Sequence, residues 1–133
     1  MLAQMLMPFC SVIRRRYGCG IPVTEDIKPF LTPHAFHGIF ISEYAVVETG
    51  CTIFQQVTIG QNGLINVNAE GGNAPHIGKN CYIGAGAKVI GPCRVGENVR
   101  IGANAIVVDN VPDDTTVVLQ KPRIIIREND GTQ

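Results

Sequence analysis

The chain has 133 residues, a length that fits a single domain. Its 11 basic and 11 acidic residues give a formal charge of zero, so we expect no overall attraction to nucleic acid or to an acidic partner. Aromatic residues make up only 6% of the chain, and tryptophan is absent. These numbers favour a thin core of aliphatic and small side chains over a thick globular one.

Residues 1–17 read as a short helix, apolar at first and basic at its end, where Arg14, Arg15 and Arg16 suit the negative pole of the helix dipole. We expect this helix to pack on the open end of the domain, with attachment to a membrane surface as the alternative. No stretch has the length of a membrane span. The basic run follows the apolar segment, and this order does not fit a secretory signal.

The most regular feature of the chain is a six-residue repeat of aliphatic residues. A helical face repeats about every 3.6 residues, so a spacing of six indicates short extended segments separated by turns. Each segment points one aliphatic side chain inward, and three segments close one coil of a triangular prism. The repeat occupies Ile41, Val47, Ile53 and Ile59, and then Ile77, Ile83, Val89, Val95, Ile101 and Val107.

Two further patterns share this register. Small residues stand two positions before most of the aliphatics, on the same face of each strand. Glycines follow several of them, at Gly78, Gly84, Gly96 and Gly102, where we expect them to provide the backbone freedom of a tight corner. These patterns are typical of a hexapeptide β-helix, an all-β parallel solenoid whose coils are stable only when stacked. Because so short a solenoid leaves its ends and faces uncovered, we expect an oligomer.

We predict one domain over residues 1–133, with coils over 20–111 and an irregular first coil marked by Ile21 and Ile27. The segment 61–75 is rich in Asn and Gly, which predicts a loop that leaves the prism, and such loops gather on the binding face of a solenoid. Pro112 is expected to end the coils. Residues 112–133 are predicted to form a capping segment and tail, with strands at 117–119 and 124–126.

The five cysteines are an odd number and contain no metal-type Cys-x-x-Cys pair. Cys51, Cys81 and Cys93 fall at the small inward positions, so we expect them to be core residues. Cys10 and Cys19 precede the repeat, and the pattern does not place them. Free thiols at this density favour a reducing compartment, and we expect a cytoplasmic protein.

The three histidines, His34, His37 and His76, all lie beside irregular segments and outside the aliphatic repeat. Imidazole exchanges a proton near neutral pH, so these residues are candidates for acid–base catalysis. A metal site like that of the hexapeptide-repeat carbonic anhydrases is a second interpretation, although no further acidic or histidine cluster stands near His76 to complete it. Loop histidines that only form hydrogen bonds are the third.

Three segments resemble a known family: P-H-A-F-H-G-I-F-I-S-E-Y-A-V-V, T-I-F-Q-Q-V-T-I-G and G-G-N-A-P-H-I-G-K-N-C-Y-I-G-A-G-A-K-V-I-G. Over about residues 20–123 the chain is similar to the hexapeptide-repeat O-acetyltransferases of the serine acetyltransferase type, a group that includes exopolysaccharide acetyltransferases. The resemblance implies a left-handed β-helix, an exception to the usual right-handed crossover. It also implies a homotrimer that binds acetyl-CoA between neighbouring subunits.

The resemblance also assigns the candidate site. One histidine acts as general base: His34 stands in the usual P-H-x-F setting, and His37 is the other candidate. His76, after the loop, would come from the facing subunit. Backbone amides near Gly84–Ala85 and Gly102–Ala103 could hold the pantetheine arm of the cofactor. Lys121 and Arg123 could bind its nucleotide phosphates, or be ordinary solvated charges.

The acceptor is expected to be the hydroxyl of a small molecule, a sugar or saccharide first and serine second. The long helical region that precedes the coils in serine acetyltransferases is missing here, and Glu25 and Asp26 are not clearly placed as an acidic partner of the base. Both observations disfavour serine. Neither a metal nor a covalent acyl-enzyme is expected. The alternatives are a non-catalytic β-helix scaffold and a metal-dependent, carbonic-anhydrase-like enzyme.

Overall fold

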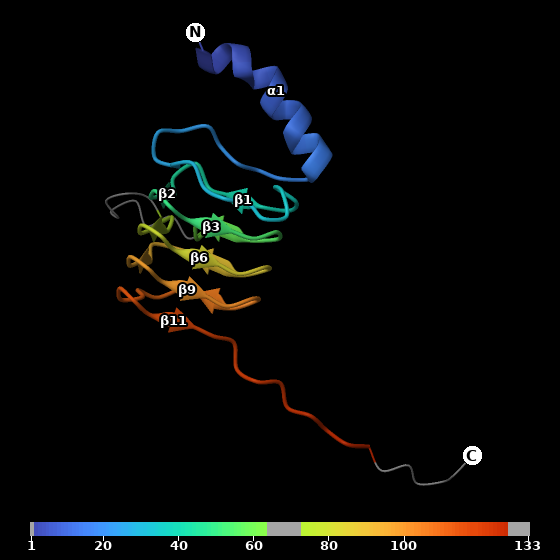
Figure 1. The fold of residues 1–133 in the computed structure, drawn as a ribbon, viewed down its shortest axis with the longest axis vertical. Coiled ribbons are helices and arrows are strands. Elements are labelled where there is room, and N and C mark those ends of the chain that lie inside the picture. The colour runs from blue at the N-terminus through green and yellow to red at the C-terminus, as the bar shows by residue number, and fades with distance from the viewer. Residues whose placement is uncertain (1, 64–72, 128–133) are drawn as a thin grey trace, which may run out of the picture.

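The computed structural model describes residues 2–63 and 73–127 and, within the first helix, the side chains from Cys10 onward. The helix α1 (Leu2–Tyr17) comes first and lies at one end of a stack of coils (Figure 1). Arg14, Arg15 and Arg16 occupy its last turn, as predicted. No helix in the described part of the chain is long and apolar enough to cross a membrane.

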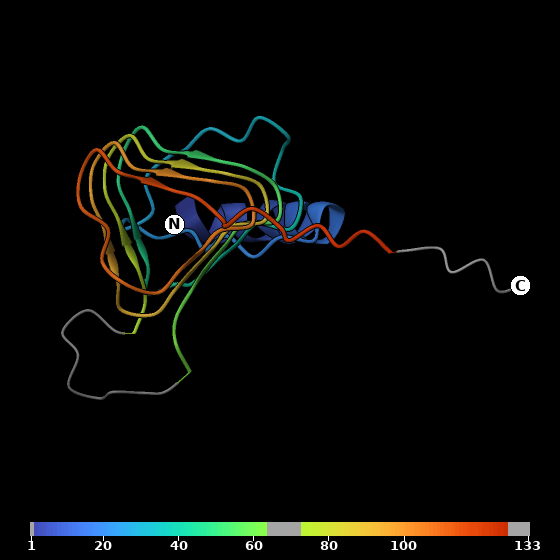
Figure 2. The ribbon, with the colours of Figure 1, turned by 90° about the horizontal axis from the view of Figure 1, so that it is seen from below.

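The coils form a triangular prism with three parallel sheets as its sides (Figure 2). We number the three sheets 1, 2 and 3 in the order in which the chain reaches them, with their strands given below. From sheet 3 the chain returns to sheet 1, one coil lower. This is the parallel β-helix predicted from the repeat, with the left-handed course that the resemblance implies. Sheet 1 contains β1 (Phe40–Ile41), β4 (Thr58–Gly60), β7 (Lys88–Ile90) and β10 (Ile106–Val107). Sheet 2 contains β2 (Val46–Val47), β5 (His76–Ile77) and β8 (Arg94–Val95). Sheet 3 contains β3 (Thr52–Ile53), β6 (Tyr82–Ile83), β9 (Arg100–Ile101) and β11 (Thr116–Val117).

The predicted core is confirmed. Every aliphatic residue of the six-residue repeat is buried, and the small inward positions, including Cys51, Cys81 and Cys93, are buried with them. Outward strand positions are more exposed, so each two-residue strand contributes one side chain to the core. Because the prism is narrow, each buried side chain packs against the coils above and below as well as across its own coil.

The strand pairing shows where the regular coil is interrupted. Phe40 pairs with Thr58, 18 residues later, and this is the length of a regular coil. Val46 pairs with His76, 30 residues later, so 12 extra residues lie between β4 and β5. These extra residues fall within the segment predicted as loop 61–75, between a strand of sheet 1 and a strand of sheet 2. The base of this segment is closed by the Asn62 amide, which donates to the Asn73 carbonyl at 2.8 Å, and residues 64–72 lie outside the described part.

The glycines that follow the aliphatics have a different role from the one predicted. Positive φ angles at the corners belong instead to residues such as Asn80, Asn98 and Gly86. At Gly84, a Cβ would lie 2.7 Å from the Ala103 nitrogen of the next coil, and Gly78 faces the backbone of Gly96 in the same way. These glycines are required because adjacent coils approach each other too closely for a side chain.

The C-terminal end differs from the prediction in two respects. The coils do not end at residue 111, because β11 pairs with β9 and extends the stack to Val117. The strand predicted at 124–126 is wrong: Ile124 to Ile126 are not in a strand and are 70–88% exposed, so they do not cap the last coil. This segment runs outward from the body (Figures 1 and 2).

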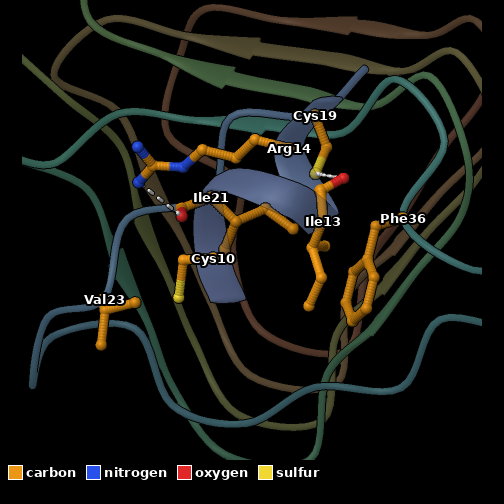
Figure 3. Close-up of a pocket in the computed structure, with 7 residues that line it drawn as sticks. All are labelled: Cys10, Ile13, Arg14, Cys19, Ile21, Val23 and Phe36. Carbon is orange, nitrogen blue, oxygen red and sulfur yellow. Dashed lines mark hydrogen bonds between the residues drawn. The ribbon is translucent and has the colours of Figure 1, made fainter. Parts of the chain in front are cut away.

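Cys10 and Cys19, which the sequence did not place, lie where α1 meets the first coil. Together with Phe36 they line an apolar cavity of about 150 Å³ between the helix and the coil (Figure 3). The Arg14 guanidinium donates to the Ile21 carbonyl at 3.3 Å and so ties the helix to this coil. The predicted packing of the helix on the open end of the solenoid is thus observed.

Candidate active site

His34 and His37 lie in a turn over residues 33–38, where the chain crosses from sheet 3 to sheet 1. We call the edge of the prism at this crossing edge 3–1. The turn starts after Leu31, which bridges to β3, and ends at β1. Ala35 has a φ of 57°, a left-handed conformation that a non-glycine residue seldom adopts. This conformation holds two exposed imidazoles at one corner of the prism.

The two histidines of this turn have different neighbours. The His37 ring packs edge-on against Tyr17 of α1, with centroids 4.9 Å apart. The His34 ring lies 5.8 Å from the ring of Phe54, on the next coil of edge 3–1. His37 is therefore engaged with the helix at the end of the prism, whereas His34 lies toward the coils below.

The predicted cofactor-binding corners lie on the same edge as His34. The Phe54 amide donates to the Ile83 carbonyl at 3.0 Å, and one coil lower the Gly84 amide donates to the Ile101 carbonyl at 2.7 Å. Phe54, Gly84 and Gly102 thus occupy equivalent positions in successive coils. Below Phe54 the edge is bare, because two glycines follow and Ala85 and Ala103 come next to them.

Lys121 and Arg123 lie beyond β11, on the exposed segment that runs outward from the body. Val118, which follows β11, takes the position that Gly84 and Gly102 take in the coils above it. Lys121 and Arg123 lie further along the chain from this position.

His76 lies on a different side of the prism, as the first residue of β5 in sheet 2. Its Nε2 is 3.6 Å from Oε1 of Glu48, and each side chain is about one-third exposed. Both line a pocket of about 160 Å³, together with Lys79, Arg94, Glu97 and Asp113. One chain therefore does not bring its three histidines together.

Glu48 is the residue that the sequence analysis missed. It follows Val47 at the corner between sheets 2 and 3, where Gly78 and Gly96 follow the aliphatics of the next two coils. A carboxylate followed by two glycines in this column, which Lys28 and Pro112 complete at its two ends, was a usable signal. Recognising it requires knowing that Ile77 pairs with Val47, across the 12-residue insertion. Counting six-residue steps without a break places Ile77 one coil below Ile59 instead, and so hides this pairing.

Two of the buried thiols, Cys51 and Cys93, are poor nucleophiles. The pKa of Cys51 is raised above its ordinary value, mainly by a hydrogen bond with the Cys81 side chain and to a lesser extent by burial. Burial also raises the pKa of Cys93. The thiolate is the reactive form of cysteine, so both residues are held in the unreactive form at neutral pH. In residues 2–63 and 73–127, no three His, Cys, Asp or Glu side chains are grouped as metal ligands.

Comparison with known proteins agrees with this architecture. Residues 74–109 match the family model described as bacterial transferase hexapeptide (six repeats). No curated protein matches the sequence. Over these residues the chain is similar to that family, and the matched repeats are coils of the left-handed β-helix described above.

Several solved structures to which the chain is similar are serine acetyltransferases, and these are acyltransferases. Isoform 3 from Entamoeba histolytica, in complex with cysteine, is 34% identical with a TM-score of 0.65, over 86% of this chain and 37% of that one. The Neisseria gonorrhoeae enzyme is 36% identical with a TM-score of 0.61, over 71% and 36%. The Brucella abortus strain S19 enzyme, in complex with coenzyme A, is 32% identical with a TM-score of 0.62, over 80% and 39%. The chain spans well under half the length of these proteins.

Proposed function

We propose that this chain is an acetyl-CoA-dependent O-acetyltransferase that acts on a hydroxyl of a sugar or saccharide, as a homotrimer with its sites between subunits. The observation that carries the proposal is the arrangement of edge 3–1: an exposed imidazole, His34, stands above an edge made bare by Gly84 and Gly102. A thioester on a flexible arm needs such an unobstructed track that leads to a base. The similarity to acetyltransferase structures supports the same reaction.

The positions of the histidines favour a site shared between copies. His34 lies on edge 3–1, whereas His76 lies on sheet 2 beside the exit of the loop. Both imidazoles can line one site only if edge 3–1 of one copy faces sheet 2 of another. A closed ring of three prisms would repeat this contact three times. This supports a trimer with His76 supplied by the facing subunit.

The proposed reaction needs only a base and the cofactor. His34 removes the proton of the acceptor hydroxyl as its oxygen attacks the thioester carbonyl. The tetrahedral intermediate then collapses, the carbon–sulfur bond breaks, and the imidazolium returns the proton to the departing thiolate. The products are the acetyl ester and free coenzyme A. Cys51, Cys81 and Cys93 are all buried in the core, away from the proposed site, so the transfer proceeds directly, without an acyl-enzyme.

Aromatic rings beside His34 favour a ring-shaped acceptor. Phe54 lies next to the imidazole, and the Tyr82 ring follows with a centroid 4.9 Å from that of Phe54. Tyr82 is 42% exposed. The apolar faces of a sugar ring suit such a surface, whereas serine has no ring to place on it. Serine remains the second acceptor to test, because the similar structures are serine acetyltransferases.

The proposal predicts that mixing the protein with acetyl-CoA and a saccharide panel releases free thiol through many turnovers, well beyond the protein's own five cysteines. The rate should exceed hydrolysis without acceptor, and serine should be a poorer substrate. The assay is run without thiol reductants, because these would mask the coenzyme A that is released; the location that we propose for the protein is the cytoplasm. Failure to bind coenzyme A would leave a non-catalytic scaffold. A zinc-dependent activity indifferent to acetyl-CoA would instead indicate the carbonic-anhydrase-like alternative.

A further inference from the structure

We propose that Glu48 is a positioning residue that holds the His76 imidazole in its working orientation, an inference that rests on the proposed function. The two side chains come from adjacent coils, and the Glu48 carboxylate is the nearest opposite charge to the imidazole, 3.6 Å from Nε2. Each side chain is about two-thirds buried, so the pair is less mobile and less screened by water than an exposed surface pair.

The coil geometry explains why Glu48 reaches His76. Val46 is the direct strand partner of His76, and Glu48 lies two residues beyond Val46 on the same outward face. The next two positions of its column are Gly78 and Gly96, so no side chain crowds the carboxylate from below. The Glu48 side chain therefore lines the pocket beside the imidazole, with Oε1 3.6 Å from Nε2.

The charge on the other side of His76 makes this carboxylate more important. Arg94 is the strand partner of His76 in the following coil and lines the same pocket. An imidazole that takes up a proton there faces a guanidinium from the adjacent strand. Glu48 supplies the compensating negative charge and fixes which ring nitrogen points at the carboxylate. Nδ1 is then the nitrogen left to act in the proposed shared site.

A double-mutant cycle tests this role with Glu48→Gln, His76→Ala and both changes together. We expect Glu48→Gln to lower kcat about tenfold while the KM for acetyl-CoA stays within about twofold. In the His76→Ala background the same change should have no further effect, because Glu48 acts only through the imidazole. Glu48→Asp should recover part of the lost kcat, because it restores the charge. All variants should retain the melting temperature of the unmodified protein.

Glu97→Gln is the matched control. Glu97 lines the same pocket, but its charge partner is Lys79 at 3.9 Å, and both of these side chains are more than half exposed. It should change kcat less than twofold. Equal losses from Glu48→Gln in both backgrounds, or no loss in either, would overturn the positioning role while leaving the acetyltransferase proposal intact. Absence of turnover in the unmodified protein would overturn both.

Discussion

Replacing His34 with alanine is expected to lower kcat for thiol release by about 10²- to 10⁴-fold, the range that a positioned general base contributes. The imidazole lies on edge 3–1, above the bare corners at Gly84 and Gly102, where the thioester would approach. The KM for acetyl-CoA should change little, because the ring is not needed to hold the pantetheine arm. Steady-state kinetics with the best acceptor of the panel measures both parameters.

His37→Ala is the matched control, because it removes the same side chain from the same turn. The His37 ring packs on Tyr17, so its loss should loosen the contact between the turn and α1. We expect at most a modest loss of kcat from it. The reverse result, with turnover surviving His34→Ala and lost in His37→Ala, would reassign the base to His37.

Ile83→Ala is expected to lower the free energy of unfolding by about 2–5 kcal/mol, the cost of emptying a large buried aliphatic site. Ile83 is fully buried in β6, and its strand is paired on both sides, with β3 above and β9 below. A cavity there therefore weakens three coils at once. Because the coils are stable only when stacked, one local defect should lower the cooperativity of the whole solenoid. Denaturant unfolding followed by circular dichroism gives the change.

The control for this change is Ile106→Ala, the same substitution in β10 at an outward position that is 67% exposed. Its effect should lie within about 0.5 kcal/mol, as for most surface substitutions. Similar losses at Ile83 and Ile106 would contradict the assignment of inward and outward faces.

The fold was predictable because one rule of spacing governs most of the chain. A side chain in every sixth position must point into a narrow prism, so Ile83 and Val95 could be assigned to the core from the sequence alone. The reason for the glycines that follow the aliphatics could not be predicted. A glycine is needed both where φ is positive and where two coils approach closely, and the sequence looks the same in the two cases. Only the distance from a Cβ at Gly84 to the Ala103 nitrogen distinguishes these causes.

The candidate site was less predictable, because it depends on which coils lie side by side. The sequence identified His34, His37 and His76 but not their arrangement on two sides of the prism. The partnership of Glu48 with His76 depends on a register that crosses the insertion between β4 and β5. The strand predicted at 124–126 was wrong for a different reason. Ile124 to Ile126 have the composition of a strand, but the stack provides no neighbouring strand for them to pair with.

Active-site complementation tests most directly whether the site is shared between copies of the chain. His34→Ala and His76→Ala variants, each with low residual activity alone, are co-expressed in equal amounts and purified as one assembly. In a random trimer about a quarter of the sites combine an intact His34 with an intact His76 from the neighbour, so we predict about a quarter of the unmodified specific activity. A mixed assembly no more active than either variant alone would contradict a site built between subunits.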